Sequence, residues 1–240
     1  MPDVTELAFA LGAGDRVVAA PPAADHPEAV ARLPRIAPGD IESIVAARPD
    51  LILASTAGSD PRVVERLAAL GLRVCTVDVT SCERLADAAR LVGRLVGNAE
   101  GGQTLAATIE GRCRAAGARA ASLPERNALY VIWWEPLIVA APGTFHDDLL
   151  RRARLVNLAP TGAGRYPRVD PELLLDPRLE VVVAADEPDL RDGLERSRLA
   201  GRARSGSVGM HWLPAAPASR PGPRLPEALE ALLAAREANP

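Results

Sequence analysis

The side chains in this sequence that could bind a metal or a metal-containing ligand are few. The sequence contains three histidines, His26, His146 and His211. Direct metal binding would require them to converge with a carboxylate, for which the candidates are Asp25, Glu135 and Glu187. The histidines are dispersed along the chain, as unrelated surface histidines would also be. We therefore predict no metal site built from protein ligands alone, and keep His26 as a single ligand contact, for example an axial ligand to a metal macrocycle.

Aromatic residues provide the second group of candidate contacts. Trp133 and Trp134 are adjacent at the end of an expected strand, so they point to opposite faces. We expect one of them in the core, and Trp134, beside Glu135, to face the ligand. Tyr166 lies on a loop, where it either contacts a ligand or covers the end of a sheet.

Two arginines near the carboxyl end have two possible roles. Arg220 and Arg224 flank a Pro-Gly-Pro sequence. They either pair with an anionic group of the ligand or cap the last helix. We retain Arg220 among the candidate ligand residues.

The motifs of common enzymes are absent from the sequence. It contains no Gly-x-x-x-x-Gly-Lys phosphate loop and no Gly-x-Ser-x-Gly elbow, and Gly12-Ala-Gly14 follows a helix rather than a strand. Asp25-His26 has no evident nucleophile to activate. We predict a binding protein rather than an enzyme.

Two similar stretches indicate how these residues are positioned. Residues 39–54 and 169–184 both contain Asp, one residue, Glu, a short apolar run, Pro and then an apolar strand. The spacing is too long for a solenoid repeat, so it indicates two lobes built on one plan. We therefore expect a ligand to bind in a cleft between the lobes, because such clefts often form binding pockets.

The remaining elements fit this α/β plan. We expect helices over 4–12, 40–47, 60–71, 147–154, 189–199 and 225–237, a further helix after Asp170, and strands over 16–20, 51–54, 73–77, 127–133, 208–213 and within 170–185. Residues 81–121 show only helical spacing, with a possible kink at Gly101-Gly102. The predicted domains are an N-terminal α/β lobe (1–80), a linking backbone helix (81–122) and a C-terminal α/β lobe (123–240), with mostly parallel sheets.

Composition excludes several classes. The net charge of −3, with 28 basic residues that are all arginine and no basic run, argues against nucleic-acid binding. No stretch approaches the roughly 20 apolar residues of a membrane span, and no signal segment is evident at the start. Cys75, Cys82 and Cys113 match no zinc spacing and have apolar neighbours, so we expect buried free thiols, and the redox compartment stays open.

Nearly the whole chain resembles the helical-backbone substrate-binding proteins, which include the receptors for vitamin B12, siderophores and haem of ABC importers. The motifs that carry the resemblance are Thr5-Glu6-Leu7, Ala10-Leu-Gly-Ala-Gly14, His26-Pro27, Pro49-Asp50-Leu51, Trp134-Glu135-Pro136, Gly143-Thr144-Phe145 and Tyr166-Pro167. The resemblance implies capture of cobalamin, a ferric siderophore or haem between two lobes, delivery to an ABC permease, a periplasmic or cell-surface location, a monomer, and lobe closure of only a few degrees. No separate cofactor is implied.

The resemblance also implies a docking role for one glutamate at the tip of each lobe. By position these are Glu42 and Glu172, which the internal repeat also aligns. Each follows a capping Asp by two residues, where the helix dipole alone favours an acid by about 0.3–1 kcal/mol.

The sequence departs from the family at several points. Positions that carry aromatic residues in the vitamin B12 receptor are here Ala23, Ile36, Ile138 and Ala216. The usual strand before Thr5 is missing, and Arg154-Leu-Val156 replaces a Gly-Gly turn. These departures leave an alternative open: a cytoplasmic ligand-binding or sensing protein with the same fold and no coupling to transport.

Overall fold

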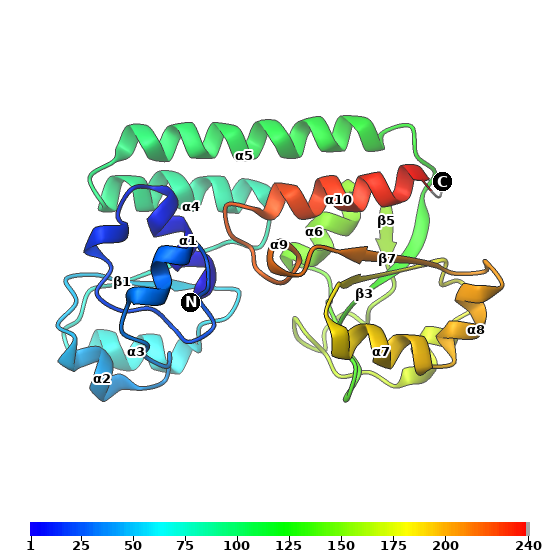
Figure 1. Ribbon diagram of the computed structural model, residues 1–240, viewed down its shortest axis with the longest axis horizontal. Coiled ribbons are helices and arrows are strands. Elements are labelled where there is room, and N and C mark those ends of the chain that lie inside the picture. The colour runs from blue at the N-terminus through cyan, green and yellow to red at the C-terminus, as the bar shows by residue number, and fades with distance from the viewer. Residues whose placement is uncertain (239–240) are drawn as a thin grey trace. The chain divides into compact units, whose positions relative to one another are not determined.

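The computed structural model describes residues 1–238 (Figure 1). The chain forms two compact units: Met1–Glu110 with Arg220–Pro223, and Gly111–Ser219 with the chain from Arg224 onward. The boundary falls inside helix α5 (Ala99–Ala120), so the segment predicted as a linker contributes to both units. The sheet of the first unit is parallel and that of the second mostly parallel, each with helices on both faces, which confirms the predicted α/β class.

The first unit is built around a two-stranded parallel sheet, β1 (Ile52–Ser55) and β2 (Val74–Val77). Helices α1 (Pro2–Ala10) and α4 (Cys82–Leu95) lie on one side of it, and α2 (Ile41–Ala46) and α3 (Pro61–Ala69) on the other (Figure 1). Short 3₁₀ turns, η1 (Gly14–Arg16) and η2 (Glu28–Arg32), occupy the loops after α1.

Capping explains where the helices of the first unit begin. The side chain of Asp40 accepts a hydrogen bond from the backbone nitrogen of Ser43 at 3.0 Å, and Asp60 accepts one from Arg62 at 2.9 Å. The cap at Asp40 was predicted, and the second helix starts at Asp60 as expected. The strand predicted over 16–20 was wrong, because only Ala20 pairs there, in an isolated bridge to Arg35.

The long helical segment is interrupted at residues 96–98 rather than at Gly101-Gly102. Gly97 adopts a positive φ of 72°, and the Asn98 side chain accepts a hydrogen bond from the Gly101 nitrogen at 2.9 Å. Gly97 therefore ends α4, and Asn98 caps the start of α5. The glycine pair has a packing role instead, since an added Cβ on Gly102 would lie 2.8 Å from the carbonyl oxygen of Ala89.

The second unit contains a five-stranded sheet with the order β4-β3-β6-β7, in which β5 also pairs with β3. Its strands are β3 (Arg126–Trp133), β4 (Ile138–Val139), β5 (Leu155–Asn157), β6 (Val181–Ala185) and β7 (Gly209–Leu213). Only β4 is antiparallel to β3. The two short strands β4 and β5 were not predicted.

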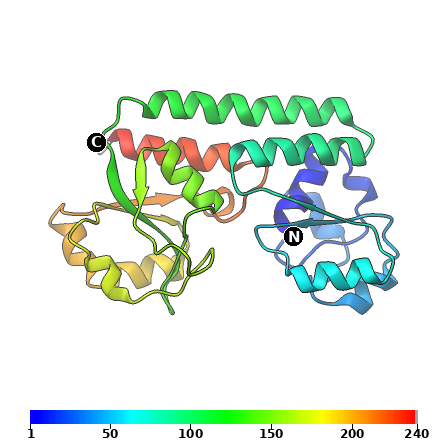
Figure 2. The ribbon, with the colours of Figure 1, turned by 180° about the vertical axis from the view of Figure 1, so that it is seen from behind.

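Helices cover both faces of this sheet. Figure 2 shows α6 (Phe145–Arg152) and α10 (Leu225–Ala238) on one face, with α7 (Pro188–Arg196) and α8 (Leu199–Arg204) on the other. The short elements η3 (Pro171–Leu175) and α9 (Ala215–Ser219) complete the unit. Leucine and valine side chains of β3, β6 and α7 form one buried layer, which includes Leu129, Val131, Val182, Leu190 and Leu194.

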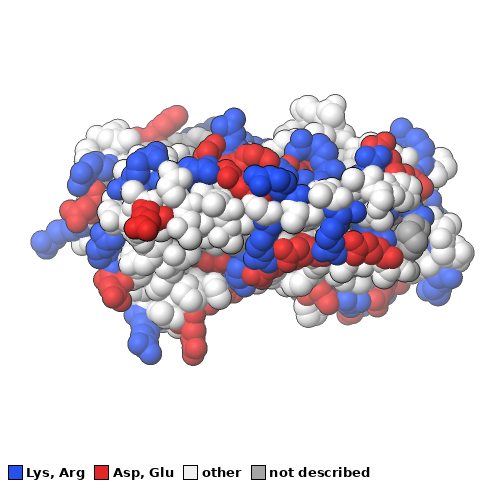
Figure 3. All heavy atoms as spheres, turned by 90° about the horizontal axis from the view of Figure 1, so that it is seen from above, with Lys and Arg blue, Asp and Glu red and all other residues white. Residues whose placement is uncertain are grey.

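The surface and the cysteines give two further results. The face in Figure 3 has basic and acidic side chains interspersed, and in the second unit two pairs, Arg112 with Glu230 and Arg119 with Glu237, join α5 to α10 at 2.8 and 2.6 Å. No helix within residues 1–238 has the length and apolarity to cross a membrane. Cys82 and Cys113 are disulfide-bonded, which corrects the expectation of free thiols, and only Cys75 is free.

Candidate functional site

In the first unit, the loop before η2 holds the predicted contact His26. The imidazole is exposed, and the peptide bond to Pro27 is cis. Its neighbour Asp25 pairs with Arg220 through both guanidinium nitrogens, and the contact of Nη2 with Oδ2 is 2.9 Å. Arg220 is therefore already engaged by a carboxylate of its own unit, which neither of its two predicted roles anticipated.

A polar cluster that sequence reasoning missed lies at the carboxyl ends of β1 and β2. Asp78 accepts hydrogen bonds from the Thr80 nitrogen at 3.0 Å, from the Thr80 hydroxyl at 2.6 Å and from the Thr56 hydroxyl at 3.3 Å. Burial acts to raise the pKa of Asp78, but these hydrogen bonds and Arg84 outweigh it, so the pKa lies below its ordinary value. The signal was available, because carboxyl ends of parallel strands are where α/β sheets bind ligands.

In the second unit, Tyr166 lies against a buried aromatic cluster. Its ring meets His146 edge-on at 5.7 Å between centroids, and His146 contacts Tyr130 at 4.4 Å and Phe145 at 3.7 Å. Burial lowers the pKa of His146 to about 3, so this imidazole is neutral at pH 7. The buried, neutral imidazole of His146 therefore packs against Tyr166 and helps to hold its ring in position.

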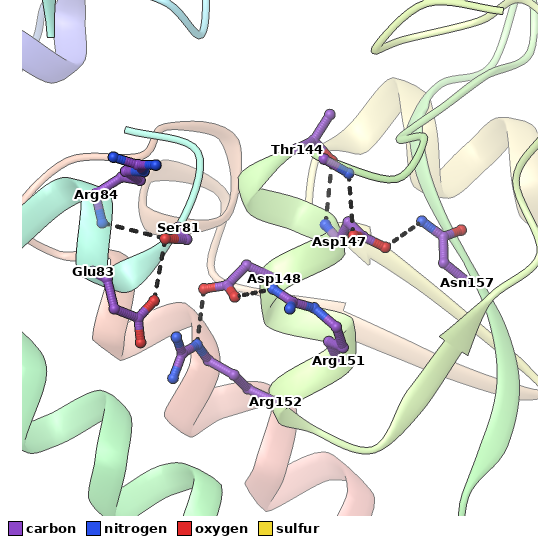
Figure 4. A network of polar contacts seen from close by, with 10 residues as sticks. Ser81, Glu83, Arg84, Thr144, Asp147, Asp148, Arg151, Arg152 and Asn157 are labelled. Carbon is purple, nitrogen blue, oxygen red and sulfur yellow. Dashed lines mark hydrogen bonds and ion pairs between the residues drawn. The ribbon is translucent and has the colours of Figure 1, made fainter. Parts of the chain in front are cut away.

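Hydrogen bonds hold this aromatic cluster in place. The Tyr130 hydroxyl donates to the carbonyl of Ala218 at 3.0 Å. Thr144 caps α6 by accepting from the Asp147 nitrogen at 3.2 Å, and Asp147 in turn accepts from the Asn157 amide at 3.0 Å (Figure 4). The motif Gly143-Thr144-Phe145 thus positions the helix that bears His146.

The two adjacent tryptophans differ in their surroundings. Trp134 packs on the core layer of α7, where an added Cβ on Gly193 would lie 2.3 Å from its indole. Trp133 is 48% exposed, and its indole nitrogen donates to the backbone carbonyl of Glu135 at 2.9 Å. The irregular pairing of β3 with β4 between Val131 and Trp133 shifts the register here, which simple alternation cannot anticipate.

The acidic candidates of the second unit differ in their surroundings. The side chain of Glu135 is exposed in the turn that connects β3 to β4. Glu187 precedes α7 and accepts a hydrogen bond from the Ser219 hydroxyl at 3.1 Å. Within residues 1–238, no group of three or more His, Cys, Asp or Glu side chains could hold a metal ion.

The two predicted docking glutamates occupy equivalent places in the two units. Glu42 lies in the first turn of α2, and Glu172 in the first turn of η3. Both are exposed, and neither carboxylate has an ion-pair partner among the described residues. The caps beneath them are the predicted ones, since Asp170 accepts from the Glu172 nitrogen at 2.8 Å.

Comparison with known proteins identifies similar sequences and folds. Residues 1–203 match the family model described as periplasmic binding protein. The vitamin B12-binding protein of Vibrio cholerae is 28% identical over 188 residues, which cover 77% of this chain and 68% of that protein. The corresponding protein of Yersinia pestis is 26% identical over 187 residues, covering 77% and 67%.

Solved structures agree with the sequence matches. The crystal structure of the periplasmic vitamin B12 binding protein of Vibrio cholerae has a TM-score of 0.87 and 26% identity, and the match covers 99% of this chain and 94% of that one. A periplasmic heme binding protein from Pseudomonas aeruginosa has a TM-score of 0.82 and 25% identity, covering 99% and 91%. These relatives are binding proteins rather than enzymes, as the sequence predicted.

Proposed function

The chain belongs to the periplasmic binding protein family, and from this we propose that it captures a metal chelate or macrocycle and delivers it to an ABC permease. The observation that carries the proposal is the match of 99% of the chain to a vitamin B12 binding protein at a TM-score of 0.87. The substrate-binding role follows from the family. The ligand class and the permease are our proposals.

Each unit, taken by itself, contains candidate ligand contacts. His26 and the Asp78 cluster are the candidates of the first unit, and Tyr166 and Glu135 those of the second. Trp133 joins them in place of Trp134, because 48% of it is exposed while Trp134 packs on α7. An aromatic face contributes about 0.5–1.5 kcal/mol beyond area burial, so a flat macrocycle suits Tyr166 and Trp133.

Arg220 has a different proposed role. Its guanidinium is paired with Asp25, so it orients the loop that bears His26 rather than binding a ligand anion. Replacing Arg220 by Gln should then weaken ligand binding indirectly, and Asp25→Asn should have a similar effect. If Arg220 contacted an anionic ligand group directly, Arg220→Gln would lower the ligand affinity much more than Asp25→Asn.

The ligand is identified by thermal melting of the purified protein with cobalamin, haem, ferric siderophores and divalent metals. A ligand at about 100 times its Kd stabilises the native state by about 2.7 kcal/mol. Tyr166→Ala should reduce the shift, whereas Leu70→Ala, at an exposed residue at the end of α3, should not. Absence of any shift across the panel would contradict the proposed ligand class.

The docking proposal concerns Glu42 and Glu172. Replacing both by Ala should lower uptake in cells while ligand affinity stays unchanged, because both carboxylates are exposed and neither has an ion-pair partner within residues 1–238. The matched control is Glu65→Ala in α3, another exposed glutamate. Uptake equal to that of the control would remove the docking role.

The disulfide state of Cys82 and Cys113 favours an exported protein, since disulfides persist in oxidising compartments. It therefore argues against the cytoplasmic alternative. Thiol labelling of the denatured protein from the native host should detect Cys75 alone. Labelling of all three cysteines would contradict export to an oxidising compartment.

A further inference from the structure

Strand β7 forms an open edge of the sheet in the second unit. It is the last strand in the order β4-β3-β6-β7, and β6 is its only partner strand within residues 1–238. In Figure 1, β7 lies between α10 on one face and the helices α7 and α8 on the other. An open edge presents backbone donors and acceptors with which another chain can pair.

The register of β7 shows which of its backbone groups point outward. The nitrogen of Gly209 donates at 2.8 Å to the residue before β6, and the carbonyl of Leu213 accepts at 2.8 Å from the residue after it. In a parallel pair every second residue makes these bonds, so Gly209, His211 and Leu213 face β6. The backbone N–H and C=O groups of Met210 and Trp212 therefore point away from the sheet, which leaves two donors and two acceptors at the edge.

The side chains of the same two residues line an apolar groove along this edge. Met210 and Trp212 lie on one face of β7, where both are partly buried against the core layer of α7 and α8. The groove has a volume of about 370 Å³, and its other walls include Leu194, Leu199 and Ala203 of the two helices. The helices thus leave room beside the edge for apolar side chains of a neighbouring strand.

This edge is complementary to a second copy of itself. If two β7 strands run antiparallel about a two-fold axis at His211, Met210 of each copy lies opposite Trp212 of the other. Each of these two pairs then exchanges two hydrogen bonds, so the outward groups of both copies are all satisfied. Opposite residues share a face, so the thioether of one copy meets the indole of the other beside the groove, which is a favourable contact.

Charges next to β7 favour the same arrangement. Arg204 lines the groove near the start of the strand, where the Val208 nitrogen donates to the Arg202 carbonyl at 3.3 Å. Asp189 lies in the first turn of α7, close to the end of the strand. Arg204 and Asp189 are exposed, and neither has an ion-pair partner among the described residues. Antiparallel pairing brings the start of one strand toward the end of the other, so opposite charges face each other across the interface.

We propose that β7 pairs with β7 of a second copy of this chain in a two-fold dimer, which continues the sheet from one copy into the other. The interface consists of the backbone edge at Met210 and Trp212 and the groove beside α7 and α8. A five-residue edge makes a small interface, so the dissociation constant should be on the order of 10–100 μM. The interface includes none of the proposed ligand contacts or docking glutamates.

The first test measures the association of the full wild-type chain by sedimentation. The protein should change from monomer to dimer as its concentration rises from about ten times below to about ten times above the expected dissociation constant. Hydrogen exchange then locates the interface. The amides of Met210 and Trp212 should exchange several-fold more slowly at the high concentration, whereas those of His211 and Leu213, which are bonded to β6, should be protected at both.

Two variants test the edge and the groove separately. Met210→Pro removes an outward N–H but no bond to β6, and Trp212→Glu places a carboxylate in the interface of each copy. Both should stay monomeric over the whole concentration range, with circular dichroism confirming that they fold. The matched control is Val156→Glu, which changes an apolar residue that is 47% exposed on β5 of the same unit and should dimerise like the wild type.

Three outcomes would overturn the proposal. A wild-type chain that remains monomeric at the highest concentration would show that the edge does not pair. A dimer lost in Val156→Glu but retained in Trp212→Glu would place the contact at β5 instead. A dimer in which the amides of Met210 and Trp212 gain no protection would place it on another surface, and this measurement on the wild type does not depend on the folding of any variant.

Discussion

The glycines at the contact of α4 with α5 make the packing of the first unit testable. Gly93 is buried in α4, and an added Cβ there would lie 2.7 Å from the Cα of Gly102 and 2.8 Å from the carbonyl oxygen of Asn98. Both neighbours are backbone atoms, so no side-chain rotation relieves the contact. The helices would have to separate by several tenths of an ångström.

Two opposing effects determine the stability of Gly93→Ala. Alanine is favoured over glycine inside a helix by about 0.8–1 kcal/mol. Overpacking costs about 1–3 kcal/mol, and the backbone contacts place this site in the upper part of that range. We therefore expect a net loss of about 1–2 kcal/mol in the free energy of unfolding.

The matched control is Gly117→Ala in α5, where nothing lies within 4 Å of the added Cβ. This variant should gain about 1 kcal/mol, so the two alanine variants should differ by about 2–3 kcal/mol. Urea unfolding followed by circular dichroism measures both, with the slopes compared to exclude a change in the unfolded state. Equal stabilisation by the two substitutions would refute the close approach of the two helices.

Three further predictions concern the aromatic cluster and the helix that supports it. Tyr130→Phe removes the hydrogen bond to the Ala218 carbonyl and should cost about 1 kcal/mol in thermal unfolding; no loss would mean that the bond is not formed in solution. Thr144→Ala removes the cap of α6 and should cost about 0.5–2 kcal/mol, and Thr144→Ser should restore most of it, which a purely steric role would not allow. The pKa of His146 is lowered to about 3 in the folded state, so below about pH 6.5 the unfolded chain binds a proton that the folded one does not. His146 should then lower stability by about 1.4 kcal/mol per pH unit well below pH 6.5, and His146→Phe should reduce the slope between pH 6 and 5 by that amount; an unchanged slope would show that His146 does not contribute to it.

Local signals in the sequence were sufficient for most elements. Asp40 and Asp60 predicted the starts of α2 and α3, because a capping side chain acts on nitrogens two or three residues away. The repeated segments predicted one strand in each unit correctly, β1 and β6. Burial of apolar strands between helices follows from composition alone, so the α/β class could be predicted.

Other features depended on residues that are distant in sequence. The position of the helix interruption at Gly97 could be predicted only by knowing that Gly93 and Gly102 pack together. This contact gives Gly102 a role in packing rather than in a kink. The 48% exposure of Trp133 arises where the pairing of β3 with β4 is irregular. The pairing of Arg220 with Asp25 joins positions on opposite ends of the chain.

The sequence by itself therefore determined the two-lobed α/β plan, the helix caps and the pair of exposed glutamates, because these depend on neighbours within a few residues. Only the tertiary structure decided which aromatic residues are exposed, which charges are paired and which buried donors are left open. His211 and Arg236 illustrate the reason. Each is an ordinary residue of a strand or a helix in the sequence. Only the packing of α10 on β7 shows that His211 Nε2 and Arg236 Nη1 are buried without a hydrogen-bond partner among the described residues.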